Sequence, residues 1–155
     1  MRKLAMSVAA LLLIGTAATL VSAASDQPKI TDPVTIKVIE HATTDKVIDV
    51  GKKGDSTGDI LTFHNPVFNA ANSNKIGRDQ GVCIRIDPKQ DSWECRWITY
   101  LKKGAITVEG PIFDDKDSTL AITGGRGSYR NARGAMDIRS RHGGTEYAFT
   151  FHIEP

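Results

Sequence analysis

Short segments in which apolar and polar residues alternate recur along most of the chain, separated by Gly, Asp, Asn and Lys. Alternation with a period of two is typical of a β-strand with one buried face, and no segment holds a helical period over three turns. Regular short strands with turn residues between them indicate a sandwich or a barrel. The pattern predicts eight strands, at residues 34–41, 59–64, 81–87, 93–101, 105–110, 119–123, 133–140 and 145–153.

The same period predicts which side chains share a face. Leu61 and Phe63 fall on the face of Asn65, and Trp97 and Thr99 share a face of a later segment. Eight meandering strands can close on themselves and leave room for one small ligand, so these side chains are candidates for the lining of a cavity.

The first predicted strand carries one polar residue on its apolar face. Val34, Ile36 and Val38 share a side, and Glu40 continues it. Two interpretations stay open: Glu40 lies in water at the mouth of a barrel, or it is buried, where an unpaired carboxylate would cost several kcal/mol.

Residues 66–80, "PVFNAANSNKIGRDQ", are polar, rich in Asn and without a clear period. They are predicted to form a long loop over one end of the barrel, where such loops often carry specificity.

The N-terminus has the pattern of a signal peptide. Arg2 and Lys3 precede an apolar stretch, and Val21-Ser22-Ala23 supplies the small residues that a signal peptidase requires. We therefore expect a signal peptide at 1–23, a flexible segment at 24–33 and one domain at 34–155. The protein would be secreted, extracellular or periplasmic, without a membrane partner after cleavage.

The chain carries 20 Lys and Arg against 18 Asp and Glu, and the two extra positive charges belong to the predicted leader. A nearly neutral domain gives little electrostatic support to nucleic-acid binding, so no nucleic-acid partner is expected.

The two cysteines, Cys83 and Cys95, lie in segments joined by the turn-rich "DPKQDS". If this hairpin centres on Lys89, the two cysteines lie directly opposite each other, within reach of a bridge. In an exported protein this predicts a disulfide.

Metal and nucleotide sites find little support in the sequence. The acidic segments 54–59 and 114–119 lack the offsets of a calcium loop, and the four histidines show no zinc-binding spacing. No metal site is expected. In "GGRGSYR" the sixth position of a dinucleotide fingerprint is Arg130 instead of glycine, and a strand-like pattern follows. Gly124, Gly125 and Gly127 are therefore expected to permit positive φ in a tight connection between strands.

Several blocks of the chain resemble the superfamily of allene oxide cyclases and dirigent proteins, in a secreted bacterial branch. They are "GDILTFHNPVFN", "KIGRDQGVCIRI", "ITVEGPI" and, most specifically, "DSTLAITGGRGSYRNARG". The resemblance implies an all-β fold: an eight-stranded, antiparallel, calycin-like barrel with an internal apolar cavity, often a homotrimer. It implies no metal and no cofactor.

The resemblance also assigns roles to individual residues. Glu40 matches the cavity glutamate of the cyclases, Asn65 an asparagine that holds an ordered water, and Cys83 a cavity cysteine. Where the cyclases have a second asparagine, two positions after the glutamate, this chain has Ala42; where dirigent proteins have "GRAQG", it has Asp79. Glu40 and Asn65 are thus the candidate catalytic residues, with a cavity predicted to be lined by Leu61, Phe63, Cys83, Trp97 and Thr99.

Three functions follow as hypotheses. The barrel binds or sterically steers a small hydrophobic or phenolic molecule; or it is a cofactor-independent isomerase or cyclase, in which Glu40 stabilises developing positive charge; or it is a surface protein with a filled barrel. The size and lining of a pocket separate the third hypothesis from the other two.

Overall fold

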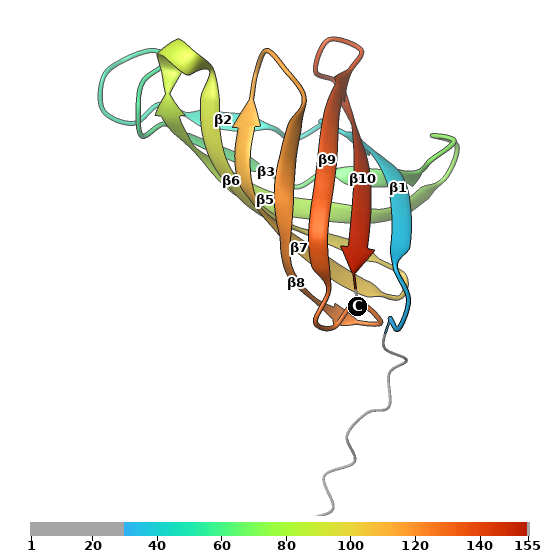
Figure 1. Ribbon diagram of the computed structural model, residues 1–155. Coiled ribbons are helices and arrows are strands. Elements are labelled where there is room, and N and C mark those ends of the chain that lie inside the picture. Colours follow the sequence, from blue (N-terminus) through green and yellow to red (C-terminus); the bar gives the residue numbers. More distant parts are fainter. Residues whose placement is uncertain (1–29, 155) are drawn as a thin grey trace, which may run out of the picture.

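A computed structural model describes residues 30–154, so the predicted signal peptide and most of the predicted flexible segment lie outside the described residues. One antiparallel sheet curls into a barrel whose two ends are formed by loops (Figure 1). Within the described residues its strands are β1 (Val34–His41), β2 (Lys46–Ile48), β3 (Ile60–Phe63), β4 (Pro66–Asn69), β5 (Lys75–Asp87), β6 (Ser92–Leu101), β7 (Gly104–Phe113), β8 (Ser118–Gly127), β9 (Arg133–Arg141) and β10 (Glu146–Glu154).

The sheet closes because β5 pairs with β6 at one end of the strand order and with β4 at the other. Strands β3 and β4 pair with successive parts of β5 and are separated only by His64 and Asn65, so together they occupy one position of the barrel. Strand β2 pairs with β3, just as β1 pairs with β4. The ten strands therefore fill eight positions, and the predicted all-β, eight-stranded antiparallel barrel is confirmed.

The prediction of a long loop at residues 66–80 is wrong. Residues 66–69 form β4, and β5 already begins at Lys75, so only a short turn connects them. The alternation along these strands was hidden because one of the buried positions is polar. Val67 and Asp79 are both fully buried, but only Val67 is apolar. A carboxyl group at a core position makes an interior strand look like a surface loop.

The prediction for the glycines was correct for Gly127 alone. Gly127 has φ +64° and ends β8, whereas Gly124 and Gly125 lie inside that strand and pair with Thr107 and Ile106. Gly125 is required for space, because a Cβ atom there would meet the carbonyl oxygens of Tyr129 and Ala105. Close approach of backbone, and not a positive φ, explains this glycine.

The disulfide prediction is confirmed. Cys83 and Cys95 face each other in the register of β5 and β6 and are joined by a disulfide. The 3₁₀ turn Pro88–Gln90 between the two strands is centred on Lys89, as the symmetry of the hairpin requires. The bridge is compatible with the predicted export. Among the described residues, no helix is long and apolar enough to cross a membrane.

Two neighbouring glycines allow a matched test of the packing in β8. We expect Gly125→Ala to lower the free energy of unfolding by about 2 kcal/mol or more, because the new methyl group must displace backbone. Gly124→Ala should change it by less than about 1 kcal/mol, because nothing lies within 4 Å of its added Cβ. Urea unfolding curves of the two variants measure the difference; equal losses would contradict this account.

Candidate functional site

A cavity of about 90 Å³ lies inside the half of the barrel where β1 ends and β10 begins. Five aromatic residues line it, and three of them pack against one another: Phe63 contacts Trp97 edge-on at 6.0 Å between centroids, and Trp97 lies 5.6 Å from Phe149. Apolar side chains dominate the rest of the wall, and the polar groups belong mainly to three acids. The lining is Glu40, Asp45, Leu61, Phe63, Cys83, Trp93, Cys95, Trp97, Ile112, Asp114, Ile138, Tyr147 and Phe149.

The structure brings most of the predicted site residues to this cavity. Thr99 is fully buried but does not belong to the lining, because it sits deeper along β6. Asn65 is also buried outside the lining and reaches the cavity only through its partner Glu40. The predicted residues in the wall are Glu40, Leu61, Phe63, Cys83 and Trp97.

Glu40 is buried, with 5% of its surface exposed, so the interpretation that places it in water at the barrel mouth is wrong. The side-chain nitrogen of Asn65 donates hydrogen bonds to Glu40 Oε1 and to Asp45 Oδ1, each at 2.6 Å. The side-chain oxygen of Asn65 accepts from the backbone N–H groups of Thr43 and Thr44, at 3.0 and 2.9 Å. One amide therefore holds Glu40 in place and ties it to the turn after β1.

Burial raises the pKa of Glu40 from 4.5 to about 7, and the nearby charge of Asp45 adds to the rise, while the hydrogen bond from Asn65 opposes it. Glu40 is thus a carboxyl group that exchanges its proton close to neutral pH. Groups of this kind are suited to general acid–base chemistry.

A second buried acid lies beside this pair. Asp79 is fully buried, and its Oδ1 accepts a 3.3 Å hydrogen bond from the backbone N–H of Asn65. Burial and the charge of Glu40 raise its pKa to about 9, so Asp79 is protonated at neutral pH. No Lys, Arg or His in residues 30–154 forms an ion pair with Glu40, Asp45 or Asp79. In the absence of a neighbouring cation, Asp79 keeps its proton at neutral pH and Glu40 gives up its proton only near pH 7.

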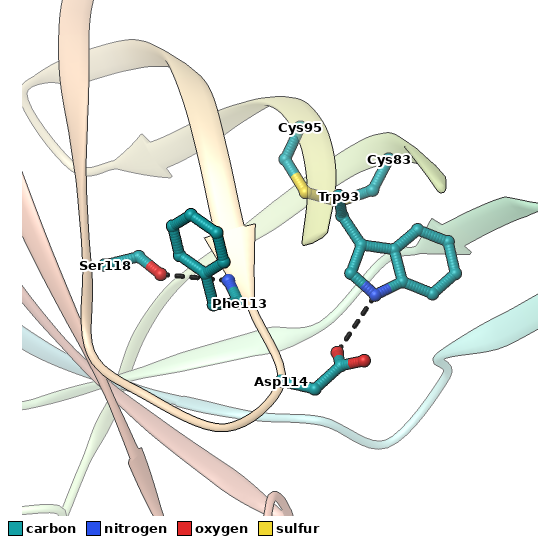
Figure 2. The surroundings of a disulfide bond; sticks show 6 residues. All are labelled: Cys83, Trp93, Cys95, Phe113, Asp114 and Ser118. Atoms are coloured by element: carbon teal, nitrogen blue, oxygen red, sulfur yellow. Dashed lines mark hydrogen bonds between the residues drawn. A yellow bond between two sulfur atoms is a disulfide. The ribbon is translucent and has the colours of Figure 1, made fainter. Parts of the chain in front are cut away.

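Three charged and aromatic residues fix the wall next to the disulfide. The indole nitrogen of Trp93 donates to Asp114 Oδ1 at 2.9 Å, as Figure 2 shows. The other oxygen of Asp114 accepts from Arg85 at 2.6 Å, and the guanidinium group of Arg85 lies 4.6 Å from the centre of the Trp93 ring. Arg85 also binds Asp55 through two hydrogen bonds of 2.8 and 2.6 Å. These contacts join the loop before β3, the β5–β6 hairpin and the loop after β7.

Some of these residues were within reach of sequence reasoning. Tyr147 and Phe149 alternate on one face of the last predicted strand, and Trp93 shares the face of Trp97. Asp45 and Asp114 lie in turns, where periodicity carries no signal. In the described part of the chain no group of three or more His, Cys, Asp and Glu side chains is arranged to hold a metal ion.

The closed eight-stranded barrel and its buried carboxyl group define a class of small antiparallel barrels with an internal cavity. Residues 33–154 match the allene oxide cyclase family, and the chain belongs to that family.

Solved structures with the same fold carry different activities. A pyocyanin demethylase is 24% identical with a TM-score of 0.69, over 78% of this chain and 100% of the other. The pterocarpan synthase dirigent protein GePTS1 is 16% identical with a TM-score of 0.62, over 80% and 87%. The Diels-Alderase AbnU is 15% identical with a TM-score of 0.64, over 79% and 98%. Likeness at these identities establishes the shared barrel.

The raised pKa of Glu40 predicts a dependence of stability on pH. The native state keeps the Glu40 proton that the unfolded chain loses above pH 4.5, so the contribution of Glu40 is largest below pH 4.5 and is lost as the pH rises through about 7. Wild type should therefore lose about 2–3 kcal/mol relative to Glu40→Gln over this range. Urea unfolding at several pH values measures it.

The matched control is Glu94→Gln, the same change at an exposed position of β6. Its unfolding free energy should run parallel to that of wild type across the range. A Glu40→Gln curve that also runs parallel to wild type would show that Glu40 is not a buried acid.

Proposed function

We propose that this barrel binds a small apolar or phenolic molecule in its cavity and steers the molecule by shape. The observation that carries the proposal is a single buried carboxyl group, that of Glu40, in a cavity walled by Phe63, Trp97 and Phe149. Apolar walls with a few fixed polar groups are the usual make-up of small-molecule sites.

The comparisons support this class of function. The family is named for a cyclase, and structures of the same fold are named as a Diels-Alderase, a demethylase of pyocyanin and a dirigent protein that is a pterocarpan synthase. A barrel that encloses a small organic molecule is the feature that such activities require in common. The cavity also favours binding over the hypothesis of a filled barrel.

A second candidate function, a cofactor-independent isomerase or cyclase, is favoured by one observation, the pKa of about 7 at Glu40. In this scheme the carboxylate of Glu40 stabilises positive charge that develops on the substrate, and Asn65 holds that carboxylate in position through its 2.6 Å hydrogen bond. Asn65 is itself held by the turn at residues 43–45, through the backbone N–H groups of Thr43 and Thr44.

Self-association, including the expected homotrimer, remains a prediction. The outer face of the sheet carries an apolar patch on neighbouring strands: the exposed Ile48 of β2 and the exposed Ile84 of β5 lie on either side of the half-buried Ile60 of β3. Apolar patches of this kind mark protein contacts more often than free surface. Export likewise remains a prediction, with which the disulfide is compatible.

Binding in the cavity is tested by a cavity-filling variant. A fluorescent naphthalene derivative should bind wild type, and Leu61→Trp should weaken binding by about tenfold or more, because the indole ring occupies the cavity. Ile84→Trp is the matched control, since Ile84 lies on the outer face of the neighbouring strand and is 47% exposed. Equal affinities of the two variants, measured by fluorescence titration, would exclude the cavity as the binding site.

Catalysis is tested separately from binding. With an unstable fatty-acid epoxide as the probe, an active cyclase should enrich one stereoisomer of the ring product, and Glu40→Gln should slow turnover by about a hundredfold. The pH profile of wild-type turnover should show a step near pH 7. A racemic product in the presence of wild type would remove the second candidate for this substrate and leave the binding proposal intact.

A further inference from the structure

The inner cavity is too small to hold a whole ligand of the proposed kind. Its volume is about 90 Å³, whereas a protein cavity that takes up benzene measures about 150 Å³. Any larger molecule with one end beside Glu40 must therefore extend beyond the inner cavity. A second pocket, of about 410 Å³, adjoins it.

The two spaces adjoin along four shared residues, and we call this shared part of the wall the neck. Four residues line both the inner cavity and the second pocket: Ile112, Asp114, Ile138 and Tyr147. They come from the end of β7, from β9 and from the start of β10, so the neck lies at one end of the barrel. Beyond it, the outer pocket is more polar and includes Lys116, Ser118 and Ser140.

The neck is held in shape without a ligand. Both oxygens of Asp114 are engaged, one by the indole N–H of Trp93 and the other by Arg85. Figure 2 shows Trp93 and Asp114 beside the Cys83–Cys95 disulfide, which anchors this part of the wall. Because Arg85 is buried and bound to two aspartates, moving Asp114 would leave a buried cation with fewer partners.

The charges around the outer pocket indicate what it accepts. Asp114 shares the single positive charge of Arg85 with Asp55, and Asp117 of the same loop pairs with Arg139 at 3.2 Å. The third acid of this loop, Asp115, does not line the pocket. The ammonium group of Lys116 lies 4.1 Å from the centre of the Phe113 ring and forms no ion pair with any residue of 30–154. Lys116 is thus the cation available to a ligand in this pocket.

We propose that the inner cavity and the outer pocket form one two-part site for an amphipathic aromatic molecule. One edge of its apolar ring enters the inner cavity at the neck, and its anionic or phenolic oxygen lies in the outer pocket at Lys116. Asp114 is a positioning residue that keeps the neck in shape. This assignment rests on the proposed function and adds to it the class of ligand and its orientation.

The experiment compares two probes that differ in charge, 1-naphthoate and the 1-naphthylmethylammonium cation, by calorimetry or by quenching of tryptophan fluorescence. Wild type should bind the anion about tenfold more tightly, as expected for a charge-assisted contact. Lys116→Met should abolish this preference. Lys103→Met, the same change in the turn at the opposite end of β7, should keep it.

Two further variants test the neck. Ile112→Trp should weaken both probes by about tenfold or more by closing the passage, and Ile112→Phe serves if the larger ring prevents folding. Asp114→Asn should weaken both probes, because it loosens the neck and leaves Lys116 in place. The cation should lose more affinity than the anion, because the variant also removes a carboxylate that lines the pocket.

The possible failures are distinct. If Lys116→Met keeps the preference for the anion, or if Ile112→Trp binds both probes as wild type does, the two-part site is wrong while cavity binding stands. If folded wild type binds neither probe nor any other ring compound, the proposed function itself is wrong.

Discussion

One buried amide, that of Asn65, holds together the features on which the rest of the site depends. It lies in the interruption between β3 and β4, where its backbone pairs with Asp79 of β5, and its side chain joins Glu40 of β1 to Asp45 in the following turn. An unpartnered buried carboxyl group would cost several kcal/mol, so the amide is what permits Glu40 to face an apolar cavity. An aspartate in its place would add another acid and remove both donors.

Two effects make this arrangement possible: the buried acids keep their protons, and the rest of the barrel supplies enough stability to offset their burial. With no cation beside Glu40, Asp45 and Asp79 in the described residues, the cluster avoids charge repulsion because Asp79 remains protonated and Glu40 ionises only near pH 7. The folding free energy that offsets the burial of these acids comes from elsewhere in the closed sheet, from its packed aromatic rings and from the Cys83–Cys95 disulfide. A site that is unfavourable by itself therefore persists because the surrounding scaffold over-determines it.

Alternation and turn residues were sufficient to predict eight of the ten described strands, the opposed cysteines and the shared face of Leu61 and Phe63, because a period of two depends only on local geometry; the short strands β2 and β4 were missed. They failed where an interior position is polar: Asp79 made part of β5 resemble a loop. They also failed for Asp45 and Asp114, which lie in turns and reach the cavity only through the closure of the sheet. Gly125 shows a third limit, since its need for space arises from Ala105 on another strand and from Tyr129 in the turn.

Two buried ionisable groups, Glu40 and Arg85, differ in how fully their charges are compensated by neighbouring residues. Arg85 lies between Asp55 and Asp114, and the hydrogen bonds that it donates to these carboxylates raise its pKa further, so it stays charged and its position is fixed. Glu40 is buried with an amide as its partner instead of a cation, so burial raises its pKa to about 7 and the carboxyl group exchanges its proton near neutral pH. Full compensation of charge suits a residue that must not change, and incomplete compensation suits one that must respond to a ligand. The contrast places a permanently charged residue in the wall beside the disulfide and, at Glu40, a carboxyl group that exchanges its proton near neutral pH.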